Sequence, residues 1–518
     1  MELKPLPVGI QTFRKIIHGG YLYVDKTRNI YELIRNPTGA YFLSRPRRFG
    51  KSLLISTLEE IFQGNRDLFK GLWLYDSPYQ WPVHPVIRID FSLKRVESAE
   101  ELKRTIVWLL GLQAERYQIS IREGDYIQQF TDFIVQISAQ KQVVILVDEY
   151  DKPLLDNIED IEEAKRIREV LKGFYTVIKA MDAHVRFVLL TGVSKFGRVG
   201  VFSGLNNLQD LTLHPRYAAL LGITQEEMER DFAGHISSLA QRVEQPKADL
   251  LQKIRLWYNG FHFSDEGEAV YNPFSLLQLF ESQKFQNFWF ESGTPTFLLK
   301  ILKQRGYDLQ SLEQLEVSEL AFSTYEIENL DIVPLLFQTG YLTIKGYVDR
   351  FQIYTLSYPN YEVHRAFLAH LLNTYGSVEL SLTSSSLNRL TQALFTANWP
   401  RFFEVLNSFL ASISYEMQIK QEKYYQTIFY LIFKLIGLEI QAEARTNQGR
   451  IDAVIETAQA VYIFEFKLSG SAAEALAQIE TRAYFAPYLA AGKPLHLLGV
   501  NFEMEQRAIT EWQATRRN

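Results

Sequence analysis

The feature that most limits the possible fold is a short apolar segment that runs into a basic, glycine-containing loop and then into a helix. Ala40-Tyr-Phe-Leu43 predicts a buried strand, and Leu53-Leu-Ile-Ser-Thr-Leu-Glu-Glu-Ile61 predicts a helix. The loop between them, Ser44-Arg-Pro-Arg-Arg-Phe-Gly-Lys-Ser52, ends like a phosphate-binding loop. A strand, such a loop and a helix in this order form the local unit of a parallel α/β sheet, so the segment predicts that fold.

The residues at the end of this loop each have a physical task. Gly50 lets the backbone approach a phosphate group, Lys51 reaches the terminal phosphates, and Ser52 ligates Mg²⁺. The start of the following helix adds the positive end of its dipole. We place the neighbouring cations Arg47 and Arg48 in the same nucleotide-binding set.

The loop also departs from the standard pattern. G-x-x-x-x-G-K-[ST] has glycine where this chain has Arg45. The alternative is a basic surface turn capped by Ser52, with Arg45, Arg47, Arg48 and Lys51 on a solvated face. The loop on its own leaves both interpretations open.

A second apolar strand ends in two carboxylates. Val143-Val-Ile-Leu-Val147 is followed directly by Asp148 and Glu149. Asp148 can help to hold Mg²⁺ and Glu149 can polarise the attacking water, whereas either residue alone is compatible with a solvated acidic turn. A loop that contains Lys51, followed later in the chain by a strand that ends in two carboxylates, favours nucleotide binding.

Further polar residues lie at these strand ends. Thr191 and Ser194 follow the apolar run Val185-Arg-Phe-Val-Leu-Leu190, where they either sense the γ-phosphate or cap the strand. Asp151 and Lys152, just past the acidic pair, either line the same site or form a surface ion pair of little energetic consequence. We assign that pair no role.

The chain is long enough for several folded units, because 518 residues exceed what one hydrophobic core usually serves. Apolar strands alternate with helices up to about residue 191 and predict a parallel sheet. From Tyr415 onward we expect a helix, three strands, a helix, a strand and a helix. The predicted parts are a nucleotide-binding α/β domain at 1–210, a helical lid or winged-helix-like region at 211–345, a helical connector at 346–405 and a second α/β domain at 406–518.

The second α/β domain contains a carboxylate-lysine pattern. Gly449-Arg-Ile-Asp-Ala-Val-Ile455 and Val461-Tyr-Ile-Phe-Glu-Phe-Lys-Leu468 predict neighbouring strands joined by a short turn. Strand alternation puts Glu465 and Lys467 on one face. If the strands pair, Asp452 approaches Glu465, and the two carboxylates offer Mg²⁺ the oxygen ligands that it prefers.

Lys467 would then orient or help to deprotonate a metal-activated water against a phosphodiester. The following capping box, Ser471-Ala-Ala-Glu474, opens a helix that can point Gln478 at the metal or substrate. The alternative for Glu465 and Lys467 is a solvent-facing charge pair on an edge strand.

Composition narrows the chemistry. The formal net charge is -5 and the pI about 6.1, so any nucleic-acid binding must depend on local basic patches. The absence of cysteine excludes disulfides, thiolate nucleophiles and sulfur-ligated zinc. No segment has the pattern of a membrane span, and we expect a cytoplasmic location.

Together these motifs resemble a bacterial family of AAA-ATPase-like proteins fused to a PD-(D/E)XK nuclease-like domain. The resemblance covers nearly the whole chain, and the family is similar in using arginine-proline where a standard loop has its first glycine. The matching segments are Val8-Gly-Ile-Gln-Thr-Phe13, Tyr21-Leu-Tyr-Val-Asp-Lys26, Arg45-Pro-Arg-Arg-Phe-Gly-Lys-Ser52, Val147-Asp-Glu-Tyr-Asp-Lys-Pro153, Phe202-Ser-Gly-Leu-Asn-Asn-Leu208, Tyr271-Asn-Pro-Phe-Ser275, Ser292-Gly-Thr-Pro-Thr-Phe297, Gly449-Arg-Ile-Asp452 and Phe464-Glu-Phe-Lys467.

The resemblance implies an AAA-like first domain and a restriction-endonuclease-like α/β fold for the last one. It implies two sets of site residues: Lys51 and Ser52 on phosphate and Mg²⁺ with the acidic pair Asp148 and Glu149, and the nuclease triad Asp452, Glu465 and Lys467.

Two functions from different classes follow. In the first, ATP binding or hydrolysis gates Mg²⁺-dependent cleavage of nucleic acid, DNA in preference to RNA. In the second, the protein is a nucleotide-dependent switch or scaffold whose nuclease-like domain binds without cutting. An oligomer is compatible with both, and neither needs a membrane.

Overall fold

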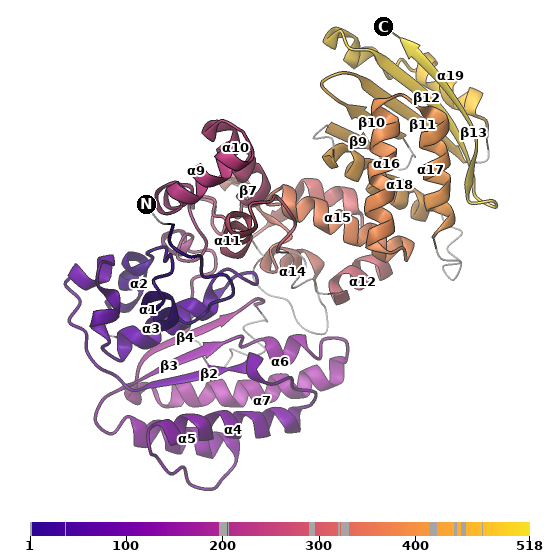
Figure 1. The fold of residues 1–518 in the computed structure, drawn as a ribbon. Helices are drawn as coiled ribbons and strands as arrows, with labels where there is room; N and C mark the ends of the chain where they lie inside the picture. Colours follow the sequence, from indigo (N-terminus) through magenta and orange to yellow (C-terminus); the bar gives the residue numbers. More distant parts are fainter. Residues whose placement is uncertain are drawn as a thin grey trace. The chain divides into compact units, whose positions relative to one another are not determined.

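The computed structural model describes residues 3–36, 38–195, 205, 207–289, 296–319, 322, 331–413, 422–439, 443–446, 452–468 and 470–517. The chain divides into two compact units, Met1–Thr294 with Gln310–Val363, and Pro295–Leu309 with His364–Asn518. The boundaries expected near residues 210, 345 and 405 fall inside these units. Figure 1 shows the elements of both units.

The first unit is built on the expected parallel sheet. Its strand order is β2-β3-β4-β1-β5, with every neighbouring pair parallel. The central strand β3 is buried along its whole length, as its continuous apolar run predicts. The strands are β1 (Ala40–Ser44), β2 (Val86–Asp90), β3 (Val143–Asp148), β4 (Val185–Gly192) and β5 (Gln209–Asp210).

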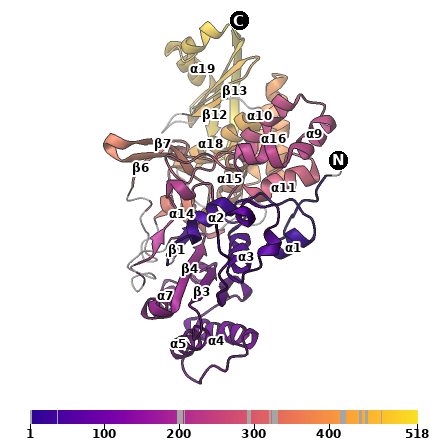
Figure 2. The same cartoon turned by 90° about the vertical axis from the view of Figure 1, so that its left-hand side faces the viewer.

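Helices cover both faces of this sheet (Figure 1). Val144 and Leu146 of β3 pack into the core beneath α3, whereas the alternate residues point to the opposite face of the sheet and are also buried. Figure 2 shows α4 and α5 packed together beyond α7. The helices are α1 (Phe13–His18), α2 (Thr27–Ile34), α3 (Lys51–Phe62), α4 (Ala99–Arg116), α5 (Tyr126–Ile137), α6 (Lys152–Leu155) and α7 (Ile161–Ala180).

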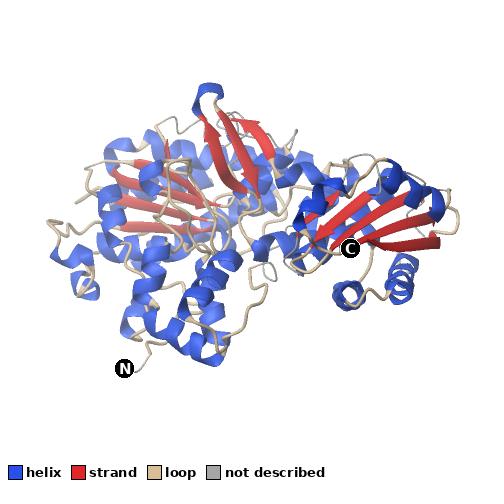
Figure 3. Ribbon diagram, turned by 90° about the horizontal axis from the view of Figure 1, so that it is seen from above, coloured by secondary structure: helices blue, strands red, loops and turns tan. Residues whose placement is uncertain are grey.

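The middle of the chain is mostly helical, as expected, but it also contains a small sheet. Three antiparallel strands in the order β6-β8-β7 form it, and Figure 3 shows them as a separate group. The helices are α8 (Gln225–Asp231), α9 (Ala233–Arg242), α10 (Lys247–Tyr258), α11 (Pro273–Ser282) and α14 (Ile332–Gln338), and the strands are β6 (Leu315–Ser318), β7 (Thr343–Val348) and β8 (Ile353–Ser357).

The small sheet corrects the expectation that 346–405 is a helical connector. The hairpin of β7 and β8 occupies the start of that region, and helices α15 (Tyr361–Gly376) and α16 (Leu380–Phe395) come after it. Burial along β7 does not alternate between the two faces, because the strand extends from a buried end at Thr343 to an exposed end at Val348. The periodicity that announces a half-buried strand is therefore missing.

The second unit contains a five-stranded sheet in the order β13-β12-β11-β10-β9, with β11 and β12 parallel and the other pairs antiparallel. Helix α19 contacts β11, β12 and β13, and the aromatic residues Phe464 and Phe466 of β11 pack against α18. The elements are α12 (Thr296–Gln304), α17 (Trp399–Ala411), α18 (Glu422–Glu439), β9 (Glu443–Thr446), β10 (Asp452–Glu456), β11 (Val461–Leu468), α19 (Ala472–Thr481), β12 (Leu495–Glu503) and β13 (Ala508–Arg517).

The expected order of elements in this unit holds except at its end. The last predicted helix is wrong, because β13 is a strand that pairs with β12 along nearly its whole length. Strand β13 lies at the sheet edge and most of its residues are at least partly exposed, so its sequence lacks an apolar alternation. No helix in the described part of the chain combines the length and apolarity that a bilayer crossing requires.

Candidate nucleotide-binding and nuclease-like sites

The loop after β1 wraps around the amine of Lys51. Gly50 has φ 92°, a left-handed conformation that glycine adopts without strain, and α3 begins at the next residue. The Lys51 Nζ donates to the carbonyl oxygens of Arg45 at 3.0 Å and Pro46 at 3.1 Å, and the residue is only 4% exposed. A buried lysine at a helix start does not fit the alternative of a solvated basic turn.

Arg45 takes the place of the first glycine by turning inward. Its guanidinium donates to the carbonyl oxygens of Ser44, Thr212 and Tyr217 and lies 4.0 Å from the ring centre of Phe263. Burial lowers the pKa of this guanidinium to about 9. Arg45 is therefore part of the packing beneath the loop.

The rest of the loop is held by the middle region. The Trp289 Nε1 donates to the Arg47 carbonyl oxygen at 3.0 Å, and the Arg48 guanidinium lies 3.7 Å from the ring centre of Phe274. Phe49 is buried against the rings of Phe261 and Phe263.

Pro46 is enclosed in the same way. A Cβ on Gly340 would come within 2.8 Å of the Pro46 Cγ, so only glycine fits there without a shift. Contacts with residues of the middle region therefore fix the conformation of this loop, as glycine backbone geometry does in a standard phosphate loop.

Asp148 stands at the carboxyl end of β3, separated from the loop strand by β4. It is fully buried, and its Oδ1 accepts a hydrogen bond from the Thr191 Oγ1 at 2.7 Å. Its Oδ2 is buried and has no hydrogen-bond partner in the part of the chain that the structure describes. A buried carboxylate oxygen without a donor fits a divalent cation, because such an oxygen otherwise lacks compensation.

Glu149 follows in a left-handed conformation, with φ 53°. Burial raises the pKa of its carboxyl group, while the charge on Lys51 lowers it and those on Asp151 and Asp148 raise it. The lysine and the acidic residues therefore lie close enough to interact. Lys51 and Glu149, which the sequence analysis placed in one site, thus interact electrostatically.

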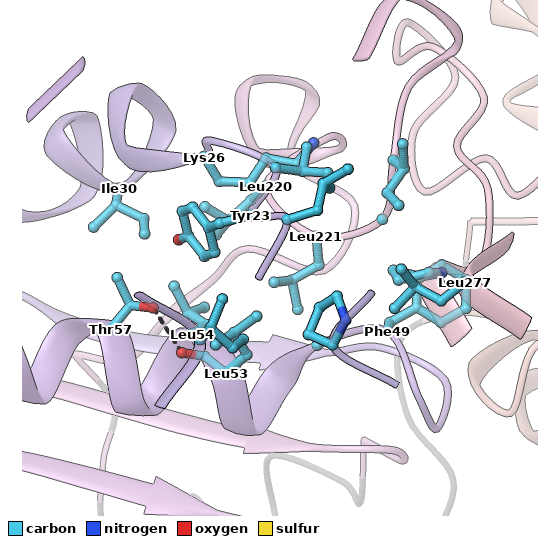
Figure 4. Close-up of a pocket in the computed structure, with 18 of the residues that line it drawn as sticks. Tyr23, Lys26, Ile30, Phe49, Leu53, Leu54, Thr57, Leu220, Leu221 and Leu277 are labelled. Atoms are coloured by element: carbon cyan, nitrogen blue, oxygen red, sulfur yellow. Dashed lines mark hydrogen bonds between the residues drawn. The ribbon is translucent and has the colours of Figure 1, made fainter. Parts of the chain in front are cut away.

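A cavity lies beside this loop that the sequence analysis did not predict (Figure 4). Its volume is about 110 Å³, and its lining is mostly apolar, with Lys26 and Thr57 among the polar exceptions. Leu53, Leu54 and Thr57 of α3 form one wall, and residues of the N-terminal segment and the middle region form the others; among them are Tyr23, Lys26, Ile30, Leu220, Leu221 and Leu277. These walls are remote from one another in sequence, so no local pattern marks the cavity.

One lining residue also joins two walls of the cavity. The Lys26 Nζ forms an ion pair with the Glu227 Oε2 of α8 at 2.6 Å and donates to the Ala219 carbonyl oxygen at 2.9 Å. Burial lowers the pKa of the Lys26 amine, and Glu227 partly offsets this effect.

In the second unit, the strands pair in the predicted register. Asp452 of β10 lies opposite Glu465 of β11, and cross-strand partners in an antiparallel pair share one face of the sheet. The side chain of Asp452 lies outside the described residues. Among those that the structure describes, no group of three or more His, Asp or Glu side chains forms a metal cluster.

Glu465 and Lys467 are joined through Gln478 of α19. The Lys467 Nζ donates to the Gln478 Oε1 at 2.5 Å and to the Glu465 Oε1 at 3.4 Å, and the Gln478 Nε2 donates to the same Glu465 oxygen. Glu465 is 1% exposed, and β11 is the middle strand of five. The structure thus contradicts the alternative of a solvent-facing pair on an edge strand.

The polar network continues beyond the predicted residues. The Gln478 Nε2 and the Arg482 Nη1 both donate to the Tyr484 hydroxyl at 3.2 Å. The sequence analysis placed Gln478 near this site but did not single out Arg482.

Comparisons with known proteins agree with the two predicted domain types. Residues 7–202 match the family described as a predicted AAA-ATPase, and residues 420–512 match the PD-(D/E)XK nuclease superfamily. The chain is 41% identical over 523 residues to a protein of Azotobacter chroococcum mcd 1, described as an uncharacterized protein in the vnfD 5'region, and the match covers 98% of each. The chain belongs to this family of AAA-ATPase-like nuclease-domain fusions.

In this member of the AAA-ATPase-like fusion family, each of the two sets of motif residues falls within one of the matched regions. Lys51, Asp148 and Glu149 lie within the predicted AAA-ATPase, and Glu465 and Lys467 lie within the nuclease-superfamily domain. The roles assigned to these residues, and those of Arg47, Arg48, Ser52, Thr191 and Asp452, stay predictions.

Proposed function

We propose that the first unit binds and hydrolyses ATP with Mg²⁺, and that the last domain cleaves phosphodiester bonds of nucleic acid, DNA in preference to RNA, under control of that nucleotide. The observation that carries the first half is the buried Asp148 oxygen without a partner in the described residues; Asp148 and Lys51 both act electrostatically on Glu149, which supports a common site. The second half is supported by the Asp452 and Glu465 register.

In the nucleotide site, Lys51 exchanges the carbonyl oxygens of Arg45 and Pro46 for phosphate oxygens, and the backbone at the start of α3 donates to the same group. Ser52 and Asp148 would hold the cation, which would supply charge neutralisation on the phosphates. Glu149 orients the attacking water and accepts its proton. Its raised pKa suits that task, because a more basic carboxylate takes up a proton more readily.

The cavity beside Gly50 is suited to the base of the nucleotide. It is apolar, adjoins the phosphate loop, and is closed on one side by Leu220 and Leu221. A planar heterocycle between this side and the α3 wall would remove apolar surface from water, which favours its binding.

In the nuclease-like site, Asp452 and Glu465 offer carboxylate oxygens from adjacent strands. A bound Mg²⁺ would supply a more acidic water and charge neutralisation at the phosphate. Lys467, held by Gln478, orients the water and stabilises the developing negative charge.

Separate variants test the two halves in the full chain. Lys51→Ala should weaken ATP binding about a hundredfold or more and abolish turnover, whereas the control Lys70→Ala, at an exposed ion pair with Asp67, should leave both unchanged. Binding is measured by titration with a fluorescent ATP analogue, and turnover by phosphate release. Wild-type protein that binds no nucleotide at micromolar concentrations would refute this half.

The nuclease half is tested with labelled single- and double-stranded DNA and RNA, with Mg²⁺ or EDTA and with or without ATP. Asp452→Ala should abolish cleavage, and the control Glu505→Ala, at an exposed residue, should not. If wild type and Asp452→Ala leave all substrates equally intact, a scaffold that binds without cutting is the better account.

A further inference from the structure

The carboxylate of Asp151 holds the end of strand β4. Its Oδ2 accepts hydrogen bonds from the backbone N–H groups of Val193 at 3.1 Å and Ser194 at 2.6 Å, and from the Ser194 hydroxyl. Asp151 is fully buried, and Lys152 pairs with Asp156 instead. The surface ion pair considered for Asp151 and Lys152 is therefore wrong.

The segment that Asp151 holds is the one that carries Thr191. The Tyr150 N–H donates to the Thr191 carbonyl oxygen at 3.0 Å, and the Tyr150 hydroxyl donates to that of Ser194 at 2.9 Å. The Ser44 hydroxyl, at the end of β1, donates to the Val193 carbonyl oxygen at 2.5 Å. The ends of β1, β3 and β4 are thus joined around Thr191.

A carboxylate suits this position better than a neutral side chain. Three donors converge on one oxygen, and an ionised carboxylate accepts such bonds more strongly than an amide of the same shape. The charge of Lys51 acts on the carboxyl groups of both Asp151 and Glu149 and lowers the pKa of each, against the effect of burial.

We propose that Asp151 is a positioning residue of the nucleotide site: it fixes the end of β4 so that Thr191 keeps the Asp148 carboxylate oriented toward the Mg²⁺ of a bound nucleotide. The geometry behind this is the short path from Asp151 through Ser194 and Thr191 to Asp148. The inference rests on the proposed nucleotide function and adds a residue to it.

The test compares Asp151→Asn, Thr191→Val and the double variant in the full chain, with Asp156→Asn as the control. A fluorescent ATP analogue is titrated in EDTA and in Mg²⁺, and phosphate release gives kcat and KM. In Asp151→Asn we expect affinity in EDTA to stay within about twofold, the gain from Mg²⁺ to fall about tenfold, and kcat to fall about tenfold or more, as for a misplaced catalytic group. Asp156→Asn should behave as wild type.

The double variant shows whether Asp151 acts through Thr191. If it does, Asp151→Asn adds little in the Thr191→Val background, because both changes remove the same orientation of Asp148. Ser194→Ala removes one donor and keeps both N–H groups, so it should give a smaller effect of the same kind. It serves as the second variant if Asp151→Asn unfolds, as judged by circular dichroism.

Three results would overturn the inference: no effect of Asp151→Asn, equal weakening of binding in EDTA and in Mg²⁺, or losses that add fully to those of Thr191→Val. Failure of the proposed function looks different. If wild type binds no nucleotide and Lys51→Ala changes nothing, both ideas fall; if wild type binds without turnover, hydrolysis alone falls and the Mg²⁺ titration decides the role of Asp151.

Discussion

Removing one partner of the buried ion pair between Lys26 and Glu227 should destabilise the first unit locally. The side chains are only 11% and 14% exposed, so water screens the pair weakly. Loss of one partner from a buried pair costs about 3 to 5 kcal/mol, since the other charge stays buried without compensation. In Lys26→Met, Glu227 keeps one donor, the Thr224 N–H at 2.8 Å, which favours the lower end of that range, about 3 kcal/mol.

The assay is hydrogen–deuterium exchange of peptides that cover α8, measured by mass spectrometry on the full chain. A loss of about 3 kcal/mol raises the exchange rate about a hundredfold where opening of α8 limits exchange. Glu227→Gln should cost less, because a glutamine oxygen can still accept from Lys26. The double variant should cost less than the sum of the two single variants.

The control is Lys70→Met, at the exposed pair with Asp67, which should leave exchange in α8 unchanged. Two outcomes would refute the reasoning. One is an exchange rate in Lys26→Met within about threefold of wild type, which corresponds to less than about 1 kcal/mol. The other is strict additivity of the Lys26 and Glu227 changes, which would mean that the two groups stabilise α8 independently.

Four further variants test the two sites. Lys51→Ala should weaken ATP binding about a hundredfold or more, as loss of a charge-assisted phosphate contact predicts, checked by calorimetry. Glu149→Gln should bind ATP without hydrolysing it, and it should melt at a higher temperature than wild type at pH 7. The reason is that the pKa of the Glu149 carboxyl group is raised: its contribution to stability is complete below its ordinary pKa near 4.5 and is lost as pH rises through the raised pKa, whereas the neutral amide loses nothing. An unchanged or lower melting temperature would contradict this. Glu465→Gln should lower Mg²⁺-dependent cleavage about a hundredfold or more, and Lys467→Met should do the same while leaving Mg²⁺ binding intact; equal Mg²⁺ affinity in wild type and Glu465→Gln would remove Glu465 from the metal site.

Continuous apolar runs made the parallel sheet predictable, because each of its main strands is buried on both faces and needs no partner to be recognised. The turn between β10 and β11 is short, so the register that opposes Asp452 and Glu465 followed from the sequence as well. Local pattern was sufficient where neighbours in sequence are neighbours in space.

Where long-range packing decides the outcome, the sequence was not sufficient. Arg45 turns inward because Thr212, Tyr217 and Phe263 receive it, and none of these is near it in sequence. The cavity has walls from three distant segments. The sequence assigned Asp151 no role, since only the fold shows that Val193 and Ser194 meet it.

The contacts of Trp289 and Gly340 with the loop after β1 have a mechanical consequence. Pro46, Arg47 and Phe49 each contact a residue from beyond position 260. In the proposed function, Lys51 would leave the carbonyl oxygens of Arg45 and Pro46 for a phosphate, and the tight approach of Pro46 to Gly340 would limit how far the loop could move alone. A shift of the loop on nucleotide binding would therefore also displace Gly340, and with it the start of the β7–β8 hairpin at Thr343.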